Sequence, residues 1–310
     1  MEVMQRMIHT QALLFLYVFV GVMMHHAHIV KRESRKDFIG LLVNITLPCM
    51  ILSSFNKPIS SEDMHSAVLM VLLSILSCVL SGVLSFLLWR KKPKGERSVL
   101  QFATLFSNAG NAGLPVISLV YGDVGVFYAS IFLIPIRLTM FTVGIALFAG
   151  TNGNIRTRIT GILKNPSVFV VLIGFALMAF KIALPKVLSD AVRTIGDMTS
   201  PLAMMIIGMS LAEMKPREMM NRNAFLVSLV RLIVIPAVLF FLLRIFKIDS
   251  LATAVAITLA SMPVATNTAI FAEQYDADYR FASKCVFIST VLSLLTVPLL
   301  TLLIETVKSI

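Results

Sequence analysis

Two short stretches of this chain combine amide, hydroxyl, glycine and proline residues between long apolar runs. Their members are Asn108, Asn111, Gly113, Pro115, Pro263, Thr266, Asn267 and Thr268. Asn and Thr side chains bind small solutes through hydrogen bonds, whereas Gly and Pro interrupt a helix and free backbone groups. The residue types therefore predict reversible binding of a polar solute.

Each stretch is expected to break a membrane helix near its centre. Backbone N–H and C=O groups opened in hydrocarbon cost several kcal/mol, roughly, unless protein, solute or water satisfies them. Half-helix N-termini at such a break offer N–H groups and partial positive charge, which suit a carboxylate. Taken singly, either stretch is also compatible with close packing or an ordinary proline kink. Two such stretches at matching places favour a binding site.

Arg137 lies about midway along the apolar run 124–149. A charge at the bilayer centre costs at least about 2.5–3.5 kcal/mol, so we expect it to face protein or a water-filled cavity. It either selects an anionic solute or is a structural partner for a carboxylate or carbonyl. Arg231 is expected closer to the cytoplasmic face, where its side chain extends to the headgroups.

Several other polar residues are expected at helix ends. His25, His26 and His28 lie at the cytoplasmic end of the first apolar run, where a solvated, interfacial role competes with metal or proton sensing. Asp197 and Glu213 lie near the two ends of another run. They are candidates for proton coupling, although charges at helix ends need no special role.

The elements that position these residues are membrane helices. Of 310 residues, 57% are hydrophobic and 14% are charged, with a net charge of +11; a soluble domain has roughly 25% charged residues. The chain is therefore expected to be an all-α polytopic membrane protein with ten spans. In order, these are residues 8–30, 38–55, 66–89, 98–120, 124–149, 166–182, 191–212, 224–245, 251–275 and 282–304.

The distribution of basic residues predicts the orientation. Of the 27 Lys and Arg residues, 17 lie in or beside the loops after spans 1, 3, 5, 7 and 9, and 8 lie on the other face. Because cytoplasmic loops are enriched in Lys and Arg, the first set is expected in the cytoplasm and both termini outside. We expect a cytoplasmic (inner) membrane location, with residues 151–165 forming a cytoplasmic linker.

An internal repeat relates the two halves of the chain. Tyr121 matches Tyr275 at an offset of 154, and Thr46-Leu-Pro48 matches Thr199-Ser-Pro201 at an offset of 153. Residues 1–150 and 166–310 would then each hold five spans. Because five is odd, the second repeat enters the membrane inverted, which is a plan of secondary transporters with a midplane substrate site.

The same residues resemble the auxin efflux carrier (PIN-like) family, in particular its bacterial organic-acid or malonate-type members. The motifs that carry the resemblance are Asn108-Ala-Gly-Asn-Ala-Gly-Leu-Pro115, Pro263 with Phe271-Ala-Glu-Gln-Tyr275, Leu163-Lys-Asn-Pro166, Thr46-Leu-Pro48 and Ser200-Pro-Leu202.

The resemblance implies a fold similar to bile-acid/sodium symporters, with spans 1, 2, 6 and 7 as a scaffold and spans 3–5 and 8–10 as a transport unit. It implies that spans 4 and 9 cross as broken helices, that Asn108 touches the substrate, and that Gly113, Pro115 and Pro263 complete the breaks. Homodimerisation through the scaffold is also implied. The long hydrophilic loop of the large plant members is absent.

The expected function is a secondary or facilitative carrier that moves a small organic anion across the membrane by alternating access. The alternative is a sodium- or proton-coupled symporter of another small solute. An enzyme is disfavoured because no nucleophile–base pair or metal-ligand set lies at membrane depth. Cys49, Cys78 and Cys285 are too far apart for a metal cluster. We expect contact with lipid, no nucleic-acid partner and no cofactor, and the coupling ion stays open.

Overall fold

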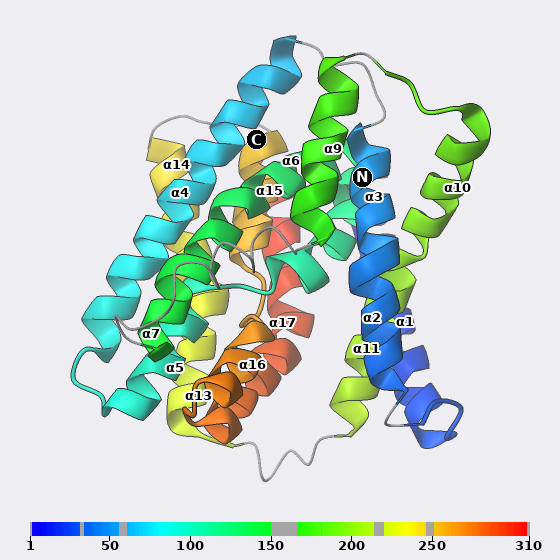
Figure 1. Ribbon diagram of the computed structural model, residues 1–310. Helices are drawn as coiled ribbons and strands as arrows, with labels where there is room; N and C mark the ends of the chain where they lie inside the picture. Colours follow the sequence, from blue (N-terminus) through cyan, green and yellow to red (C-terminus); the bar gives the residue numbers. More distant parts are fainter. Residues whose placement is uncertain are drawn as a thin grey trace. The chain divides into compact units, whose positions relative to one another are not determined.

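The structure is a computed structural model, and it describes residues 2–31, 34–55, 61–149, 166–180, 182–213, 220–245 and 251–308. Within these residues the regular elements are helices, and an isolated bridge joins two extended segments (Figure 1). The linker expected at 151–165 lies outside the described residues.

Helices occupy each apolar range that the sequence indicates. In the first half they are α1 (Glu2–His26), α2 (Arg35–Leu41), η1 (Leu42–Thr46), α3 (Leu47–Phe55), α4 (Ser61–Trp89), α5 (Lys94–Leu105), η2 (Ala109–Gly113), α6 (Leu114–Thr139), η3 (Met140–Gly144) and α7 (Ile145–Ala149). In the second half they are α9 (Pro166–Ala179), α10 (Lys186–Asp197), α11 (Thr199–Ala212), α13 (Arg222–Leu229), η5 (Val230–Val234), α14 (Ile235–Ile245), α15 (Leu251–Ala260), α16 (Asn267–Gln274) and α17 (Tyr279–Lys308). The η elements are single π-helical turns.

Five helical stretches among the described residues are long and apolar enough to cross a membrane. These are Asp37–Phe55, His65–Trp89, Ala109–Phe148, Arg222–Ile245 and Tyr279–Ile304. Several other expected spans are divided into shorter helices, as α5 is from η2 and α15 from α16. The chain is therefore a multi-pass helical membrane protein.

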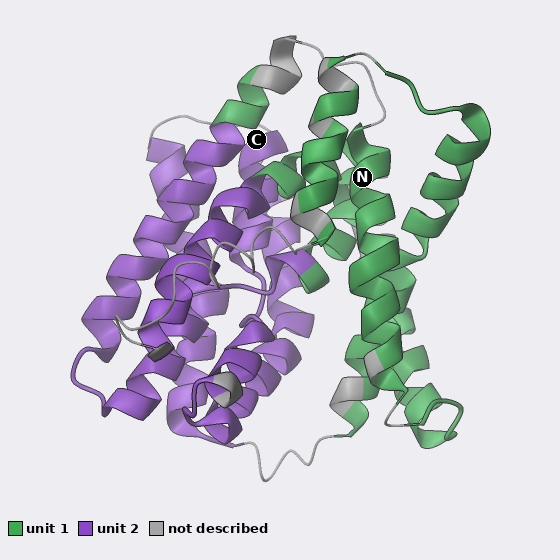
Figure 2. Ribbon diagram, in the orientation of Figure 1, with its two compact units in different colours: residues 1–68, 111–131, 163–214 green, residues 69–110, 132–162, 215–310 purple. Residues whose placement is uncertain are grey.

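The chain divides into two compact units (Figure 2). Unit 1 comprises residues 1–68, 111–131 and 163–214, and unit 2 comprises residues 69–110, 132–162 and 215–310. Each unit draws on both halves of the sequence. The assignment of 1–150 and 166–310 as two repeats, and of scaffold and transport spans, stays a prediction.

Unit 1 contains a close helix crossing between α1 and α11. A Cβ added at Gly21 would lie 2.1 Å from the carbonyl oxygen of Met205, and one at Gly208 would lie 2.0 Å from that of Val18. Glycine at both positions lets the two backbones approach, as small residues do in membrane helix pairs. The crossing therefore has no room for any other residue at these two sites.

Gly208→Ala is accordingly expected to destabilise the protein by about 3 kcal/mol, because the added methyl group would meet backbone atoms rather than a movable side chain. The melting temperature of the detergent-solubilised protein measures this effect. Gly82→Ala in α4 is the matched control, since its added Cβ would make an ordinary contact of 3.9 Å with Leu105. Equal melting temperatures for the two variants would contradict the close crossing.

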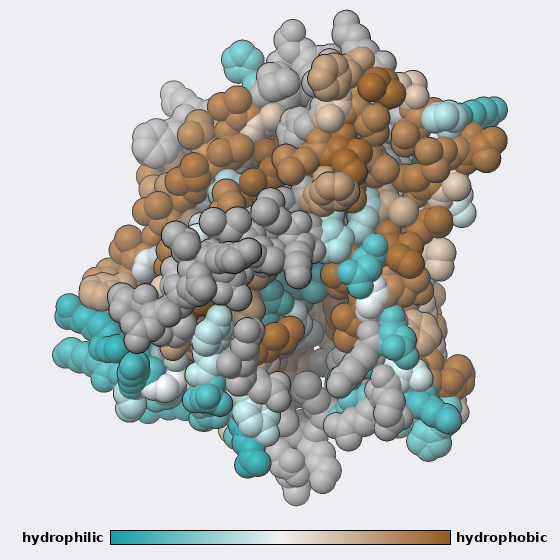
Figure 3. Space-filling view, viewed as in Figure 1, coloured by the Kyte–Doolittle hydropathy of each residue, from teal (hydrophilic) through white to brown (hydrophobic). Residues whose placement is uncertain are grey.

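Unit 2 presents an apolar stripe along α4. Val68, at the edge of unit 1, begins it, and the exposed residues Leu72, Ile75, Val79, Val83 and Phe86 follow at helical spacing. On the opposite side of α4, the Ser74 hydroxyl donates to the carbonyl oxygen of Phe132 at 2.6 Å. Hydrophilic side chains gather where α4 leads to α5 (Figure 3). The stripe is suited to lipid.

Candidate substrate site

The first expected interruption separates α5 from η2. Phe106 adopts an extended conformation (φ −114°, ψ 120°), and residues 106–108 lie outside any helix. The helix resumes as the π-helical turn Ala109–Gly113 and continues into α6. Two Gly and two Asn residues within 108–113 make this a weak place for an α-helix. The break, at residues 106–108, adjoins the stretch that the sequence predicts, but Asn111, Gly113 and Pro115, which were expected within the break, lie in η2 and α6.

The second interruption separates α15 from α16. Residues 261–266 are non-helical, and α16 begins at Asn267. Pro263 cannot donate a backbone hydrogen bond to the preceding turn, which explains why α15 ends at Ala260. The Ser261 hydroxyl donates to the carbonyl oxygen of Thr258 at 2.7 Å, so it satisfies one of the last carbonyls of α15.

The two interruptions pair with each other within unit 2. The Asn108 N–H donates to the Pro263 carbonyl oxygen at 2.7 Å, and the Ala265 N–H donates to the Phe106 carbonyl oxygen at 3.0 Å. Ser107 and Val264 form the antiparallel bridge between these bonds. The pairing satisfies groups that would otherwise be unpaired in the membrane interior, and it holds both breaks at one place.

Side chains support the pairing from both sides. The Ser107 hydroxyl donates to the Leu259 carbonyl oxygen at 3.1 Å, and the Val264 N–H donates to the Ser289 hydroxyl at 3.0 Å. Ser289 belongs to α17, and its role could not be predicted because a serine in an apolar helix has no local signature. The two extended segments are therefore anchored within unit 2.

The predicted site residues at the second break and the start of α16 differ in accessibility. Thr266 is exposed and Asn267 is half-buried, whereas Pro263 and Thr268 are buried. The Thr268 hydroxyl has no hydrogen-bond partner among the described residues. Asn267 Nδ2 lies 3.2 Å from the sulfur of Met140, a weak acceptor. Among the described residues, this weak contact is the one hydrogen bond that the Asn267 side chain makes.

Arg137 lies beside the first break. A Cβ built on Gly110 would be 3.4 Å from Arg137 Nη2, so the guanidinium faces the backbone of η2. Arg137 is half-buried, and the described residues give it no hydrogen-bond or ion-pair partner. Met140, which contacts Asn267, is one helical turn further along the same segment. The break of span 4, Arg137 and Asn267 thus belong to one neighbourhood of unit 2.

The remaining predicted residues of span 4 fall in unit 1. Asn111 is half-buried, and Gly113 and Pro115 are buried. The Pro115 carbonyl oxygen accepts a hydrogen bond of 3.1 Å from the Ser200 hydroxyl. Ser200 lies in the Thr-Ser-Pro motif that matches span 2, but its link to span 4 was not expected from the sequence.

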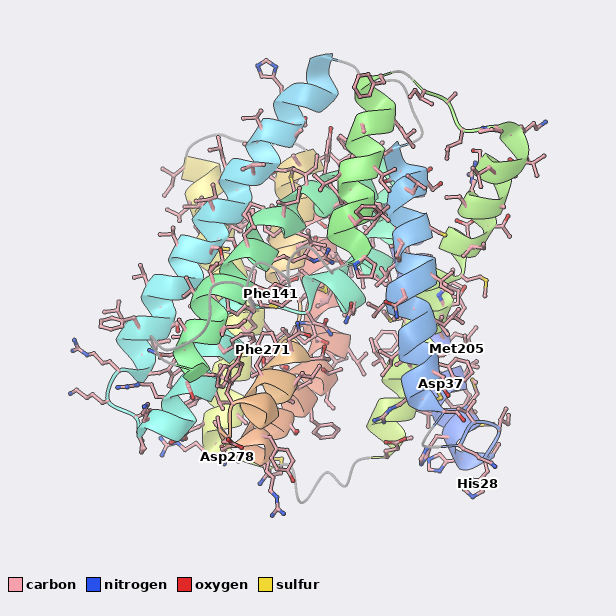
Figure 4. The ribbon with its side chains drawn as sticks, in the orientation of Figure 1. His28, Asp37, Phe141, Met205, Phe271 and Asp278 are labelled. Atoms are coloured by element: carbon pink, nitrogen blue, oxygen red, sulfur yellow. The ribbon has the colours of Figure 1, made fainter. Side chains whose placement is uncertain are left out.

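An aromatic cluster, which no sequence motif indicates, adjoins this neighbourhood. The rings of Phe141 and Phe271 lie 6.1 Å apart, centroid to centroid, and those of Phe102 and Phe271 lie 5.5 Å apart (Figure 4). Phe141 follows Arg137 by four residues, and Phe271 follows Asn267 by four, so each polar residue shares a helix face with an aromatic one. An apolar wall therefore lies next to the polar groups.

The expectation that Arg231 extends to the membrane surface is wrong. Arg231 is only 2% exposed, and it lies in η5 near the middle of the stretch Arg222–Ile245. Its guanidinium donates to the carbonyl oxygens of Thr104 and Ala260 at 2.9 Å and 3.0 Å. Because these acceptors are distant in sequence, the length of the apolar run alone could not reveal them.

The helix-end residues have local structural roles in unit 1. His28 has a positive φ of 53°, and its N–H donates to the His25 carbonyl oxygen, so it ends the turn after α1 (Figure 4). Glu213 forms an ion pair with Arg35 of α2. Asp197 is exposed at the end of α10. Metal or proton sensing by the histidines stays a prediction.

A multi-pass helical protein with two paired breaks inside apolar segments has the architecture of a membrane transporter. The chain belongs to the family described as membrane transport protein, whose model matches residues 7–301. This match confirms the resemblance to PIN-like carriers that the motifs of spans 4 and 9 indicate.

Curated relatives are transporters as well. The chain is 28% identical over 302 residues to an uncharacterized transporter of Methanocaldococcus jannaschii, covering 93% of this chain and 95% of the relative. An uncharacterized transporter of Methanothermobacter thermautotrophicus is 25% identical over 292 residues, with 91% and 93% covered. A candidate malonate transporter of Rhizobium meliloti is 23% identical over 216 residues, or 67% of each chain.

Proposed function

We propose that this protein is a secondary or facilitative transporter that moves a small organic anion across the cytoplasmic membrane by alternating access. The observation that carries the proposal is Arg137, whose guanidinium adjoins Gly110 at the paired breaks and has no partner among the described residues. An unpaired charge at this depth is expensive, so an anionic solute would offset its cost.

The neighbouring groups suit a carboxylate. A guanidinium can donate two parallel hydrogen bonds to a carboxylate, and Asn108 and Asn267 add neutral amide donors. The N-termini of η2 and α16 carry partial positive charge at the same breaks. The aromatic wall of Phe141 and Phe271 would contact an apolar part of the solute. These features favour an organic acid over an inorganic ion.

Alternating access is proposed from the repeat. Gly122 (φ 63°) follows Tyr121, and Asp276 (φ 52°) follows Tyr275, so both matched tyrosines precede a left-handed residue at the same offset of 154. Gly122 marks the turn between the expected spans 4 and 5, inside the helix α6. This correspondence supports ten spans in two inverted repeats. The family resemblance suggests spans 1, 2, 6 and 7 as scaffold and spans 3–5 and 8–10 as transport unit, although residues 111–131 of spans 4 and 5 group with unit 1.

A thermal-shift screen of the purified protein tests the proposal. A ligand that binds only the native state raises the melting temperature by mass action, by an amount that grows with its concentration over Kd. The panel should hold mono- and dicarboxylates, malonate among them, and indole acids. Each acid is paired with its neutral amide, which has the same shape without the charge. Stabilisation by acids and not by amides is expected, and equal effects would contradict anion binding.

The alternative is a sodium- or proton-coupled symporter of another small solute. Uptake into proteoliposomes distinguishes it, because coupled uptake requires an imposed sodium or pH gradient whereas facilitative uptake follows the substrate gradient alone. Uptake of a neutral solute, driven by sodium, would favour the alternative.

We also expect both termini outside and the loop that contains Gly95 in the cytoplasm, from the excess of basic residues in the loops of that face. Gly95 is exposed, and a Cβ there meets nothing within 4 Å, so Gly95→Cys in a Cys-free background should fold normally. An impermeant maleimide added to intact cells should fail to label it. Ala183→Cys, exposed in the loop after span 6, is the external control. Labelling at position 95 from outside would reverse the topology.

A further inference from the structure

Arg231 joins the ends of the two half-helices that lead into the breaks. Thr104 is the second-to-last residue of α5, and Ala260 is the last residue of α15. The guanidinium donates to the carbonyl oxygens of both, and it also donates to the Ser81 hydroxyl at 3.3 Å. One side chain from η5 therefore bridges three other segments of unit 2.

The two carbonyl acceptors are groups that lack helical partners. The last carbonyls of a helix have no intrahelical donor, and they carry the partial negative charge of the helix dipole. Two such ends near one another inside a membrane require a positive charge. In transporters with discontinuous helices, half-helix C-terminal ends and unwound carbonyls of this kind coordinate coupling cations such as sodium.

We propose that Arg231 is a tethered cation that takes the place of a bound metal cation at the C-terminal ends of α5 and α15, so that these carbonyls bind no coupling ion during transport. This inference deepens the proposed function, and it rests on that function only where it concerns ion binding during transport. Its structural part, that the protein supplies the cation itself, stands on the contacts of Arg231 alone.

Arg231 and Arg137, both in unit 2, thus have different roles. Arg231 is fully buried and donates to three oxygens, although its Nε has no partner among the described residues. Arg137 is half-buried and makes no such contacts within the described part of the chain. Arg231 therefore acts as a positioning residue on the break, while Arg137 is available to the solute.

The test removes the tethered charge and supplies it from solution. Arg231→Ala leaves a space in which a guanidinium ion can replace the missing head group. We expect the melting temperature to fall by about 10 °C, because two helix ends lose their cation. Low millimolar guanidinium should restore a saturable part of this loss, whereas urea, a neutral molecule of the same shape, should not. Such rescue would not follow from a simple packing defect.

Two further measurements keep the test decisive where Arg231→Ala folds poorly. Arg231→Lys should be more stable than Arg231→Met, because it retains a charge at similar length. The melting temperature of the wild-type protein should be the same in sodium as in N-methylglucamine buffers. Arg222→Ala, which removes an exposed charge from the start of the same span, is the matched control and should change neither property.

Saturable stabilisation of the wild-type protein by sodium would overturn the proposal, as would an Arg231→Met variant as stable as the wild type. The thermal measurements need no substrate. Failure to find a transported acid would therefore contradict the proposed function without touching this inference.

Discussion

Asn108→Ala is expected to reduce transport by about 10- to 150-fold, or more, while leaving the fold intact. The Asn108 backbone N–H, not its side chain, pairs with the Pro263 carbonyl oxygen at 2.7 Å. The substitution therefore preserves the contact between the two breaks. It removes an amide donor beside the proposed anion, and a hydrogen bond to a charged group contributes about 1.5–3 kcal/mol.

The measurement is uptake of the acid found in the screen, by proteoliposomes that contain equal amounts of each variant, together with the melting temperature. Asn108→Asp should be weaker still, because a second negative charge repels the anion. Asn44→Ala is the control, since Asn44 is an exposed amide in the π-helical turn η1 and donates to Gly40. Loss of folding in Asn108→Ala would instead assign Asn108 a structural role.

Arg137→Gln should weaken the binding of an organic acid by roughly 10- to 150-fold. The physical reason is the loss of one charge-assisted contact, worth about 1.5–3 kcal/mol. No described residue depends on Arg137 for a hydrogen bond, so the folded state should tolerate its replacement. Arg137→Lys should retain more affinity than Arg137→Gln, although less than wild type, because a lysine keeps the charge but not the planar pair of donors.

The measurement is the concentration dependence of uptake and of the thermal shift. Arg193→Gln, which removes an exposed guanidinium from α10, controls for net charge. An unchanged affinity in a well-folded Arg137→Gln variant would show that anion preference rests on the asparagines and half-helix N-termini. It would also remove the observation on which the proposed function depends.

The positions of the helices and of their breaks follow from the sequence because their causes are local. Runs of apolar residues long enough to cross a bilayer determine where helices form. The Gly, Asn and Pro residues near Asn108 and Pro263 disfavour a regular α-helix through local effects. The cost of a charge in lipid likewise predicts that Arg137 faces protein or a water-filled cavity, and its side chain is half-buried beside Gly110. The family resemblance depends on the same local motifs.

Only the tertiary structure decided what the polar groups do. The donors and acceptors that join the breaks, and the contacts of Arg231 with Thr104 and Ala260, connect residues separated by 29 to 159 positions. Arg137 and Arg231 are the same residue type, and each lies inside an apolar helical stretch, so hydropathy treats them alike. Arg231 donates hydrogen bonds to helix-end carbonyls, whereas Arg137 donates none to a described residue. The difference arises because hydrogen bonding depends on which carbonyls the fold brings within about 3 Å.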